Sequence, residues 1–301
     1  MRDLVASVQQ RLRNAAEASG RPVQDVMQYY GTERFLYRLS ESRHADLFLL
    51  KGALMLSLWH GAQARATRDI DVQGRMDNSP EAVQRAIAEI CAQDVEQDGV
   101  VFDATTVEVE TIVEDGVYQG VRAKFWGRLG NVKLRMKVDV GFGDPVVPAP
   151  VRRQYPTILD FPPPVLLGYT PESAIAEKLE AMVKLGLLNG RMKDYHDIWR
   201  LSQQLDFEGD VLAEAVRQTF GFRGTEPVPV PEGLTPGYAE REGNREMWRA
   251  FLRRHQLTDA DLGLDEVVSA VAEFLLPLLG AVCEGRCWPY VWHAPGPWQP
   301  A

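Results

Sequence analysis

The chain is poor in cysteine. Its 301 residues include only three, Cys91, Cys283 and Cys287. The number is odd and no two of them form a CxxC pair, which argues against both a disulfide framework and a zinc site. We therefore expect buried or chemically idle thiols at these positions.

Long apolar runs are also missing. The two most apolar stretches, residues 45–50 and 274–282, are short, and Pro277 interrupts the second. Neither approaches the roughly 18 residues that a membrane-spanning helix requires. The first twenty residues read as an amphipathic helix without the apolar core of a signal peptide. The sequence thus predicts a cytoplasmic protein with no membrane partner.

A basic excess is absent as well. The chain has 33 Lys and Arg against 42 Asp and Glu, which gives a formal net charge of −9. A general, non-specific nucleic-acid binder is usually basic, so the composition argues against that class. A local basic groove remains compatible with an acidic chain.

The first half of the chain mixes helical and extended patterns. Residues 1–45 repeat apolar side chains with a helical period, and residues 51–60 predict a short helix that opens at Gly52. Residues 79–93 predict another helix, with Ser79 as its N-cap. Three stretches then alternate by twos, as neighbouring strands of one sheet do: 105–114, 118–130 and 131–143.

The second half is helical in pattern. A proline-rich stretch at 145–164 is interpreted as a segment that crosses between two domains. The first helix after it has Thr170 as N-cap and stops at Asn189–Gly190. Further helices are predicted at 192–205, 244–256 and 264–279, and the tail after them has no assignable element. We predict an α+β protein with domains at 1–165 and 166–301.

Two aspartates stand two residues apart in an extended segment, Asp69 and Asp71. In a strand they share one face, while Ile70 and Val72 anchor the other face on the core. Two carboxylates this close repel each other unless a cation lies between them, and oxygen ligands suit Mg²⁺ or Mn²⁺. Other interpretations are a calcium loop, a phosphatase strand, a sugar-nucleotide site, and a solvated strand edge with two surface acids.

The strand predicted at 131–143 supplies a third carboxylate. Lys133, Arg135, Lys137 and Asp139 have the same parity, so the acid ends a basic row on one face. Three carboxylates on adjacent strands, flanked by cations, are what metal-assisted nucleotidyl or phosphoryl transfer requires. For each basic residue, including Arg152 and Arg153, a solvated salt bridge is the competing interpretation.

At this point two stretches resemble the AbiEii-type nucleotidyltransferase toxins of abortive-infection toxin–antitoxin systems, which act in phage defence. The first, "LLKGALMLSLWHGAQARATRDIDV", matches their opening motif; the second is "AEKLEAMVKLG" followed by "RMKDYHDIW". The resemblance runs from about Phe48 to Leu205. The residues that carry it are Lys51, Gly52, Arg65, Thr67, Asp69, Asp71, Lys178, Asp194 and Asp197.

The resemblance implies a polymerase-β-like nucleotidyltransferase fold, a mixed sheet with flanking helices followed by a helical C-terminal domain. It implies that Asp69 and Asp71 bind metal with Asp139 as third carboxylate, and that Lys178 and the pair Asp194 and Asp197 are catalytic. Nucleotide-binding residues implied at the same site are Lys51, Gly52, Thr67, Arg68 and Lys178. One departure is Ala53, which stands where many nucleotidyltransferases have a hydroxyl residue after the glycine.

The residues around Lys178 support part of this. Its helical neighbours Ile175, Leu179 and Met182 are apolar, and a lysine beside such a stripe needs a partner for its ammonium or must reach out to solvent. Asp194 and Asp197 share a helix face, where they could equally be first-turn acids favourable to the helix dipole. His196, between them, is predicted to be a surface residue.

The function predicted from these features is a metal-dependent nucleotidyltransferase toxin of a toxin–antitoxin system. It would use an NTP and Mg²⁺ or Mn²⁺, act on an acceptor such as the tRNA 3′ end, and have a cognate antitoxin as partner. Two alternatives stay open. One is nucleotidylation or phosphorylation of a protein hydroxyl, and the other is a degenerate family member that only binds a partner.

Overall fold

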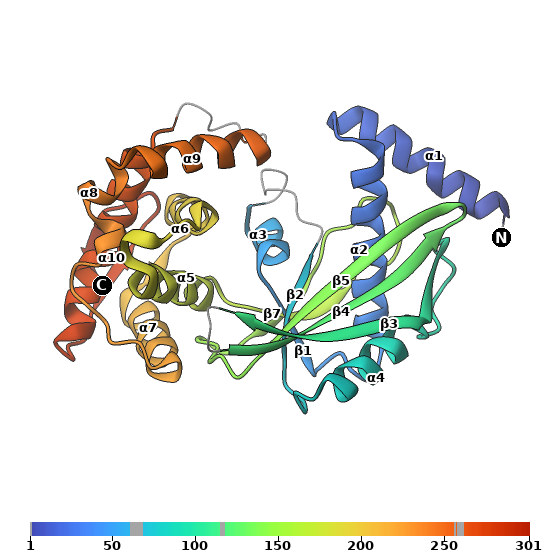
Figure 1. Ribbon diagram of the computed structural model, residues 1–301, viewed down its shortest axis with the longest axis horizontal. Helices are drawn as coiled ribbons and strands as arrows, with labels where there is room; N and C mark the ends of the chain where they lie inside the picture. Colours follow the sequence, from blue (N-terminus) through green and yellow to red (C-terminus); the bar gives the residue numbers. More distant parts are fainter. Residues whose placement is uncertain (1, 61–68, 115–117, 256, 258–261) are drawn as a thin grey trace. The chain divides into compact units, whose positions relative to one another are not determined.

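The computed structural model describes residues 2–60, 69–114, 118–255, 257 and 262–301 (Figure 1). The described chain combines helices with a seven-stranded mixed sheet, which confirms the predicted α+β class. It divides into two compact units. Unit 1 holds residues 1–58, 66–143 and 151–168, and unit 2 holds residues 59–65, 144–150 and 169–301.

Among the described residues, unit 1 contains the seven-stranded sheet and four helices, one of which, at residues 53–60, ends in unit 2. The helices are α1 (Arg2–Ser19), α2 (Val23–Glu41), α3 (Ala53–His60) and α4 (Pro80–Cys91). The strands are β1 (Phe48–Lys51), β2 (Ile70–Gly74), β3 (Val100–Glu114), β4 (Tyr118–Leu129), β5 (Val132–Phe142), β6 (Val151–Gln154) and β7 (Val165–Gly168).

The sheet has the order β3-β4-β5-β2-β1-β7-β6. Strands β2 and β5 pair in parallel, as do β1 and β7, and the remaining neighbours are antiparallel. The three alternating stretches of the sequence are indeed neighbours, β3, β4 and β5. The parallel β2–β5 pair brings the two predicted acidic segments side by side.

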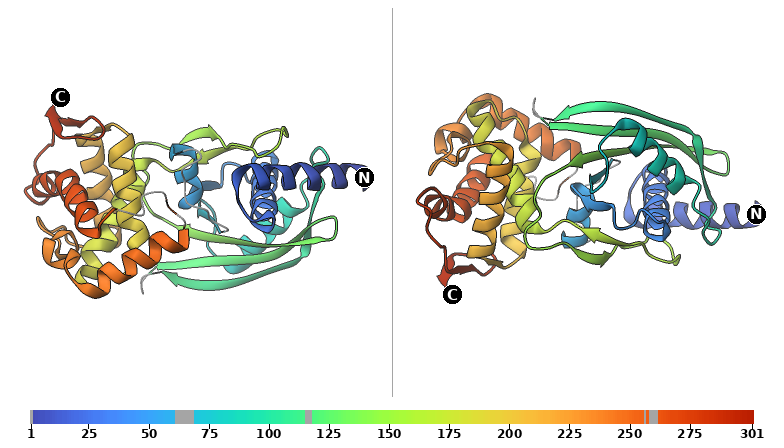
Figure 2. Two further views of the ribbon diagram at one scale, coloured as in Figure 1. Left: turned by 90° about the horizontal axis from the view of Figure 1, so that it is seen from above. Right: turned by 90° about the horizontal axis from the view of Figure 1, so that it is seen from below.

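One face of strands β3–β5 is apolar and carries the core of unit 1. Phe35 of α2 contacts Phe102 and Phe125 of the sheet, with ring centroids 5.8 and 5.1 Å apart. Helix α4 covers the same sheet, and its start is fixed as predicted, since Ser79 Oγ accepts the Ala82 N–H at 3.3 Å. Figure 2 shows α1 and α2 together on one side of β3, β4 and β5. The opposite face of these strands is polar.

Unit 2 is mainly helical. Its longer helices are α5 (Pro171–Leu185), α6 (Met192–Gln204), α7 (Gly209–Arg223), α9 (Glu242–His255) and α10 (Leu264–Cys283). Shorter elements are the 3₁₀ turns η2 (Gly186–Leu188) and η3 (Glu232–Leu234), helix α8 (Pro236–Ala239), and strands β8 (Phe207–Glu208), β9 (Tyr290–Trp292) and β10 (Trp298–Pro300).

Helix α10 is longer than the sequence indicated. By length and composition it is the one helix in the described ranges that could cross a membrane, although Pro277 interrupts its apolar run. Ten of its apolar residues are buried, and it packs against α6, α7 and α8. This packing is that of a core helix in a folded domain.

The structure adds to or differs from the sequence predictions at four places. The proline-rich segment is more than a crossing, because Val151–Gln154 forms the edge strand β6 against β7. Helix α5 ends at Leu185, ahead of the predicted Asn189–Gly190 stop, since Gly186 takes a positive φ of 50°. The tail forms β9 and β10, which the prolines and tryptophans disguised. The predicted boundary after residue 165 falls inside β7.

Candidate functional site

The parallel pair β2–β5 places two of the predicted carboxylates side by side. Asp71 of β2 and Asp139 of β5 are partners in the strand register. Their strand neighbours Ile70, Val72 and Val138 are at most 1% exposed, so the acids stand on the opposite, polar face. Asp69 lies just before β2, with its side chain 48% exposed.

The turn after β1 lies directly against Asp71. Lys51, the last residue of β1, is the register partner of Asp71, and Gly52 follows with φ 68°. A Cβ on Gly52 would lie 2.2 Å from Asp71 Oδ2, so only glycine leaves room for that carboxylate. The same glycine's carbonyl accepts the Met55 N–H at 3.1 Å and so begins α3. Lys51 itself belongs to the strand, although the sequence suggested the helix.

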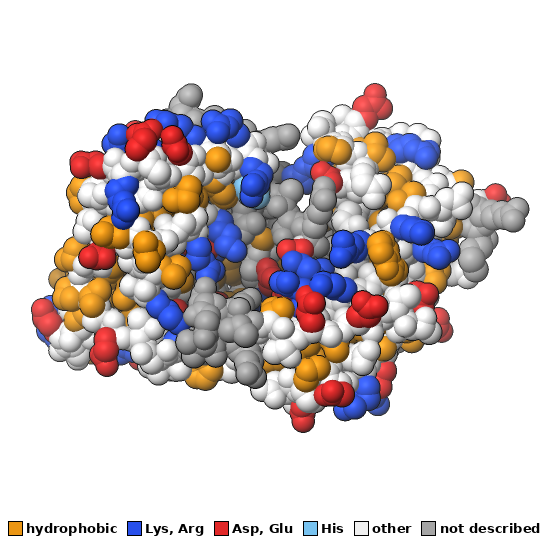
Figure 3. Space-filling view, viewed as in Figure 1, with side chains coloured by type: hydrophobic (Ala, Val, Ile, Leu, Met, Phe, Trp, Pro, Cys, Tyr) orange, Lys and Arg blue, Asp and Glu red, His pale blue; other side chains and the backbone are white. Residues whose placement is uncertain are grey.

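Cations of the neighbouring strands already engage these acids. Arg122 of β4 donates from Nε and Nη2 to the two carboxylate oxygens of Asp139, at 2.7 and 2.9 Å. Lys137 Nζ lies 2.7 Å from Asp69 Oδ2 and 3.5 Å from Asp139 Oδ2. The hydrogen bond to Asp139 raises the pKa of Arg122 further above its usual range. Figure 3 shows Lys and Arg side chains gathered over β4 and β5.

The donor chemistry of this cluster fits a hard divalent cation, because Asp69, Asp71 and Asp139 offer only oxygen atoms. Across the described residues, however, no three His, Cys, Asp or Glu side chains converge closely enough to hold a metal ion as they stand. The fork of Arg122 on Asp139 is one physical reason, since it engages both oxygens of that acid. A metal would have to compete with Arg122 for Asp139.

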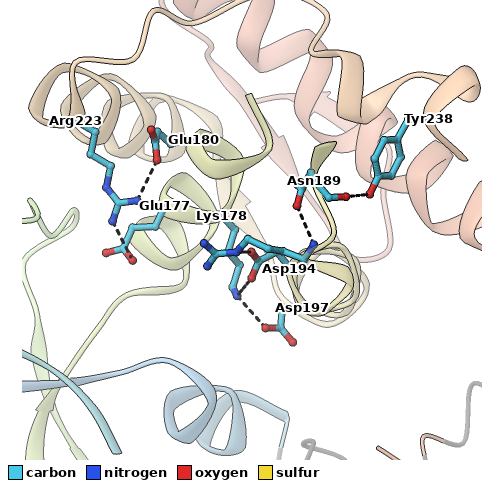
Figure 4. A network of polar contacts seen from close by, with 9 residues as sticks. Glu177, Lys178, Glu180, Asn189, Asp194, Asp197, Arg223 and Tyr238 are labelled. Atoms are coloured by element: carbon cyan, nitrogen blue, oxygen red, sulfur yellow. Dashed lines mark hydrogen bonds and ion pairs between the residues drawn. The ribbon is translucent and has the colours of Figure 1, made fainter. Parts of the chain in front are cut away.

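Unit 2 brings together the other three predicted residues. Lys178 of α5 donates from Nζ to Asp194 Oδ1 at 2.8 Å and to Asp197 Oδ2 at 2.9 Å, both on α6 (Figure 4). Arg191 Nε donates to the other oxygen of Asp194 at 2.6 Å. The Asp194 and Asp197 side chains are 1% and 2% exposed, so these are buried ion pairs and not surface acids of a first turn.

Electrostatics in this network favour the charged forms. Burial opposes the ionisation of Asp194, but Lys178, Arg191 and Lys193 outweigh it, and the pKa of Asp194 is lowered. Burial likewise opposes the charge on Lys178, and the two aspartates outweigh it, so the pKa of Lys178 is raised. The Lys178 ammonium, whose burial beside apolar side chains is unfavourable, therefore finds its charged partners inside the protein.

A second buried network flanks Lys178 on the same helix. Arg223 of α7 donates to Glu180 at 3.0 Å and lies 3.5 Å from Glu177 (Figure 4). It also donates to Asp144 at 2.9 Å. Burial opposes the charge of Arg223, yet these three acids raise its pKa. The network fixes α5 on both sides of Lys178 against α7.

The start of α6 is also fixed from outside the helix. Asn189 is fully buried. Its side-chain Oδ1 accepts the Arg191 backbone N–H at 2.9 Å, and its backbone carbonyl accepts the Tyr238 hydroxyl at 2.5 Å (Figure 4). The predicted helix stop at Asn189–Gly190 thus acts at the start of the next helix. His196 is 4% exposed and contacts the Trp199 and Trp248 rings, so its prediction as a surface residue is wrong.

The predicted site residues therefore form two clusters, one in each unit. Unit 1 holds Lys51, Gly52, Asp69, Asp71 and Asp139, and unit 2 holds Lys178, Asp194 and Asp197. Arg65, Thr67 and Arg68 lie outside the described residues. Sequence reasoning missed Arg122, Arg191 and Arg223. Strand parity opposite Asp139 could have indicated Arg122, whereas nothing local indicates Arg223.

Comparison with known proteins adds a family. The family model described as "Nucleotidyl transferase AbiEii toxin, Type IV TA system" matches residues 34–273. A search of curated proteins found no match. Two Helicobacter pylori crystal structures, a candidate nucleotidyltransferase and JHP933, are similar at 12% identity and a TM-score of 0.42 each. The similarity covers 84% of this chain in both cases, and 92% and 89% of those chains.

Proposed function

Because the chain belongs to the AbiEii nucleotidyl transferase toxin family of type IV toxin–antitoxin systems, we propose that it transfers a nucleotide from an NTP to an acceptor hydroxyl. The acceptor we propose is the 3′ end of a tRNA, and the setting is the cytoplasm. The observation that carries the proposal is the register pairing of Asp71 with Asp139, beside a glycine turn that only Gly52 can form.

The proposed cofactor is Mg²⁺ or Mn²⁺, held by Asp71 and Asp139 with Asp69 at the more exposed end. Such an ion, when bound, would polarise phosphate oxygens and lower the pKa of the attacking hydroxyl. The protein supplies three carboxylates, and two of them, Asp139 and Asp69, otherwise form ion pairs with Arg122 and Lys137. Metal binding therefore includes the release of at least part of these ion pairs.

The cations nearby have a second role in this proposal. Lys51 reaches over the same face, with its Nζ 3.7 Å from the position of a Cβ on Gly141. Gly141 is two residues after Asp139 on β5, so the Lys51 ammonium lies along the row of carboxylates. We assign Lys51 and Lys137 to phosphate oxygens of the NTP, as point charges.

The network of unit 2 is proposed to act on phosphate charge as well. Lys178 donates to two buried carboxylates, so one of the three N–H groups of its ammonium is left for a phosphate oxygen. The side chain is 16% exposed, which leaves it within reach of a ligand. Asp194 and Asp197 keep it charged and oriented.

The test is transfer of label from α-labelled NTPs to total tRNA with Mg²⁺. Wild-type protein is expected to label RNA, and Asp71→Asn to label it at least about a hundredfold less, as expected when a metal ligand is lost. Asp94→Asn, the same change at an exposed acid of unit 1, is the control and should retain activity. Equal labelling by Asp71→Asn and wild type, or no labelling by folded wild type with any NTP, would overturn the proposal.

A further inference from the structure

The polar face of β4 and β5 has an arrangement that sheet stability does not explain. In the register of the two strands, Lys124 is opposite Lys137 and Arg128 is opposite Lys133. Like charges directly opposite each other destabilise a sheet. Between these two pairs, Trp126 is opposite Arg135. The exposed ring of Trp126 thus lies between two pairs of cations on the same face.

The cations differ in how far the protein itself neutralises them. Near the carboxylates, Arg122 is paired with Asp139, Lys137 with Asp69, and Lys124 with Glu110 at 2.6 Å. Further along β5, Lys133 and Arg135 are exposed and make no hydrogen bond or ion pair through their side chains within the described residues. Lys133, opposite Arg128, and Arg135, opposite Trp126, are therefore cations that no ion pair neutralises within the described residues.

Two hollows meet at Trp126, which is 44% exposed. One, of about 480 Å³, reaches from Trp126 and Lys133 to Asp69; its lining includes Lys124, Arg135 and Lys137. The other, of about 390 Å³, continues past Trp126 and Lys133 to Val101. All of these residues belong to unit 1.

A break in the β3–β4 register shapes the second hollow. The pairing shifts between Asp103 and Glu108, and Thr106, inside the break, accepts the Trp126 N–H on its Oγ1 at 3.0 Å. Such bulges occur next to active sites, where they re-aim a side chain or end a ladder. Here the bulge residues form one wall of a hollow whose other wall is the indole.

We propose that this face binds single-stranded RNA. A base stacks on Trp126 while the backbone phosphates follow Lys133 and Arg135, and the strand runs through the larger hollow toward Asp69. Same-face residues of a strand are about 6.8 Å apart, comparable to successive phosphates of an extended chain. Only an unpaired base presents a free face to the indole, and stacking accepts any base. The proposal rests on the proposed function and gives a binding site to its RNA acceptor.

The first test separates stacking from charge. Binding of a labelled single-stranded RNA of about 12 nucleotides to the full chain is measured by anisotropy, without NTP or metal. Trp126→Ala is expected to weaken binding about 5- to 100-fold, with the salt dependence unchanged. Trp126→Phe, which keeps a ring, should recover most of the affinity. Thermal unfolding of each variant shows whether the sheet is intact.

The second test measures the contacts to RNA phosphates through the salt dependence of binding. The double variant Lys133→Gln/Arg135→Gln is expected to make the plot of log K against log salt shallower by about 1.4, which is about 0.7 for each single-strand phosphate that the protein no longer neutralises. The control is Arg75→Gln/Arg85→Gln, two exposed cations of unit 1 that line neither hollow, and its slope should stay at the wild-type value.

Three results would overturn the proposal: affinity unchanged in Trp126→Ala, a full salt slope in the double variant, or an RNA duplex or an acidic peptide bound as tightly as the single strand. Failure of the proposed function looks different. RNA binding that depends on Trp126 without any nucleotide transfer leaves the RNA site standing and removes the transferase. Transfer to a protein without RNA binding removes the RNA site alone.

Discussion

Lys178 gives the sharpest test of how unit 2 is held together. In Lys178→Met the ammonium is lost while Asp194 and Asp197, 1% and 2% exposed, stay buried. Breaking a buried ion pair costs about 3–5 kcal/mol because a charge is left uncompensated. Arg191 still holds one oxygen of Asp194 at 2.6 Å, so we expect the lower end, about 3 kcal/mol.

Urea unfolding followed by tryptophan fluorescence measures this, because five of the seven tryptophans, all but Trp59 and Trp126, lie in residues 169–301 of unit 2. A shift of the midpoint with an unchanged slope reports stability alone. Lys184→Met, an exposed lysine on the same helix, is the control and should lie within about 0.5 kcal/mol of wild type. Adding Asp197→Asn to Lys178→Met should restore about 1 kcal/mol or more, as coupled residues do.

The pH dependence has a fixed sign. The lowered pKa of Asp194 gives stability that is present above its unfolded value near 3.9 and lost as pH falls through the folded value. The raised pKa of Lys178 gives stability that is present below about 10.4 and lost as pH rises through the folded value. The deficit of Lys178→Met should be full between about pH 5 and 10 and shrink in acid. A variant as stable as wild type at pH 7 would refute this account of the network.

Two further predictions concern unit 1. Gly52→Ala should lower the thermal midpoint and weaken NTP binding, because its Cβ would lie 2.2 Å from Asp71 Oδ2 at a φ of 68°. The control is Gly221→Ala, in a helix with open space around it, which should be neutral or stabilising. Equal effects of the two substitutions would contradict this. Arg122→Gln should tighten the binding of Mn²⁺ several-fold in titration calorimetry without nucleotide, because the substitution frees the Asp139 carboxylate. An unchanged Mn²⁺ affinity would show that Arg122 does not compete with the metal.

Much of unit 1 could be predicted from the sequence because its signals are local. Alternation by twos identified β3, β4 and β5, and the same parity put Asp139 on the face of Asp71. Ser79 and Thr170 were recognised as N-caps because their side chains cap helices within three residues. Each of these features depends on residues close in the chain.

What could not be predicted depends on contacts between distant segments. Arg223 reaches Asp144 across 79 positions, and no periodic pattern links them. The strands β6 and β9 form only because β7 and β8 lie beside them. They have four and three residues and lie near prolines, so their sequences are too short to show an alternating pattern. His196 was misjudged for the same reason, since its burial comes from aromatic residues of α9.

The two clusters share a property that bears on how ligands bind. In unit 1, Asp139 holds Arg122 and Asp69 holds Lys137; in unit 2, two aspartates hold Lys178. If the proposed function is right, a metal ion or a phosphate therefore has to share or displace partners that these side chains already have. Affinity is then the difference between two ion pairs and not the full strength of one. Removing a competing partner should consequently tighten binding of the matching ligand, while removing the residue that the ligand needs should abolish it.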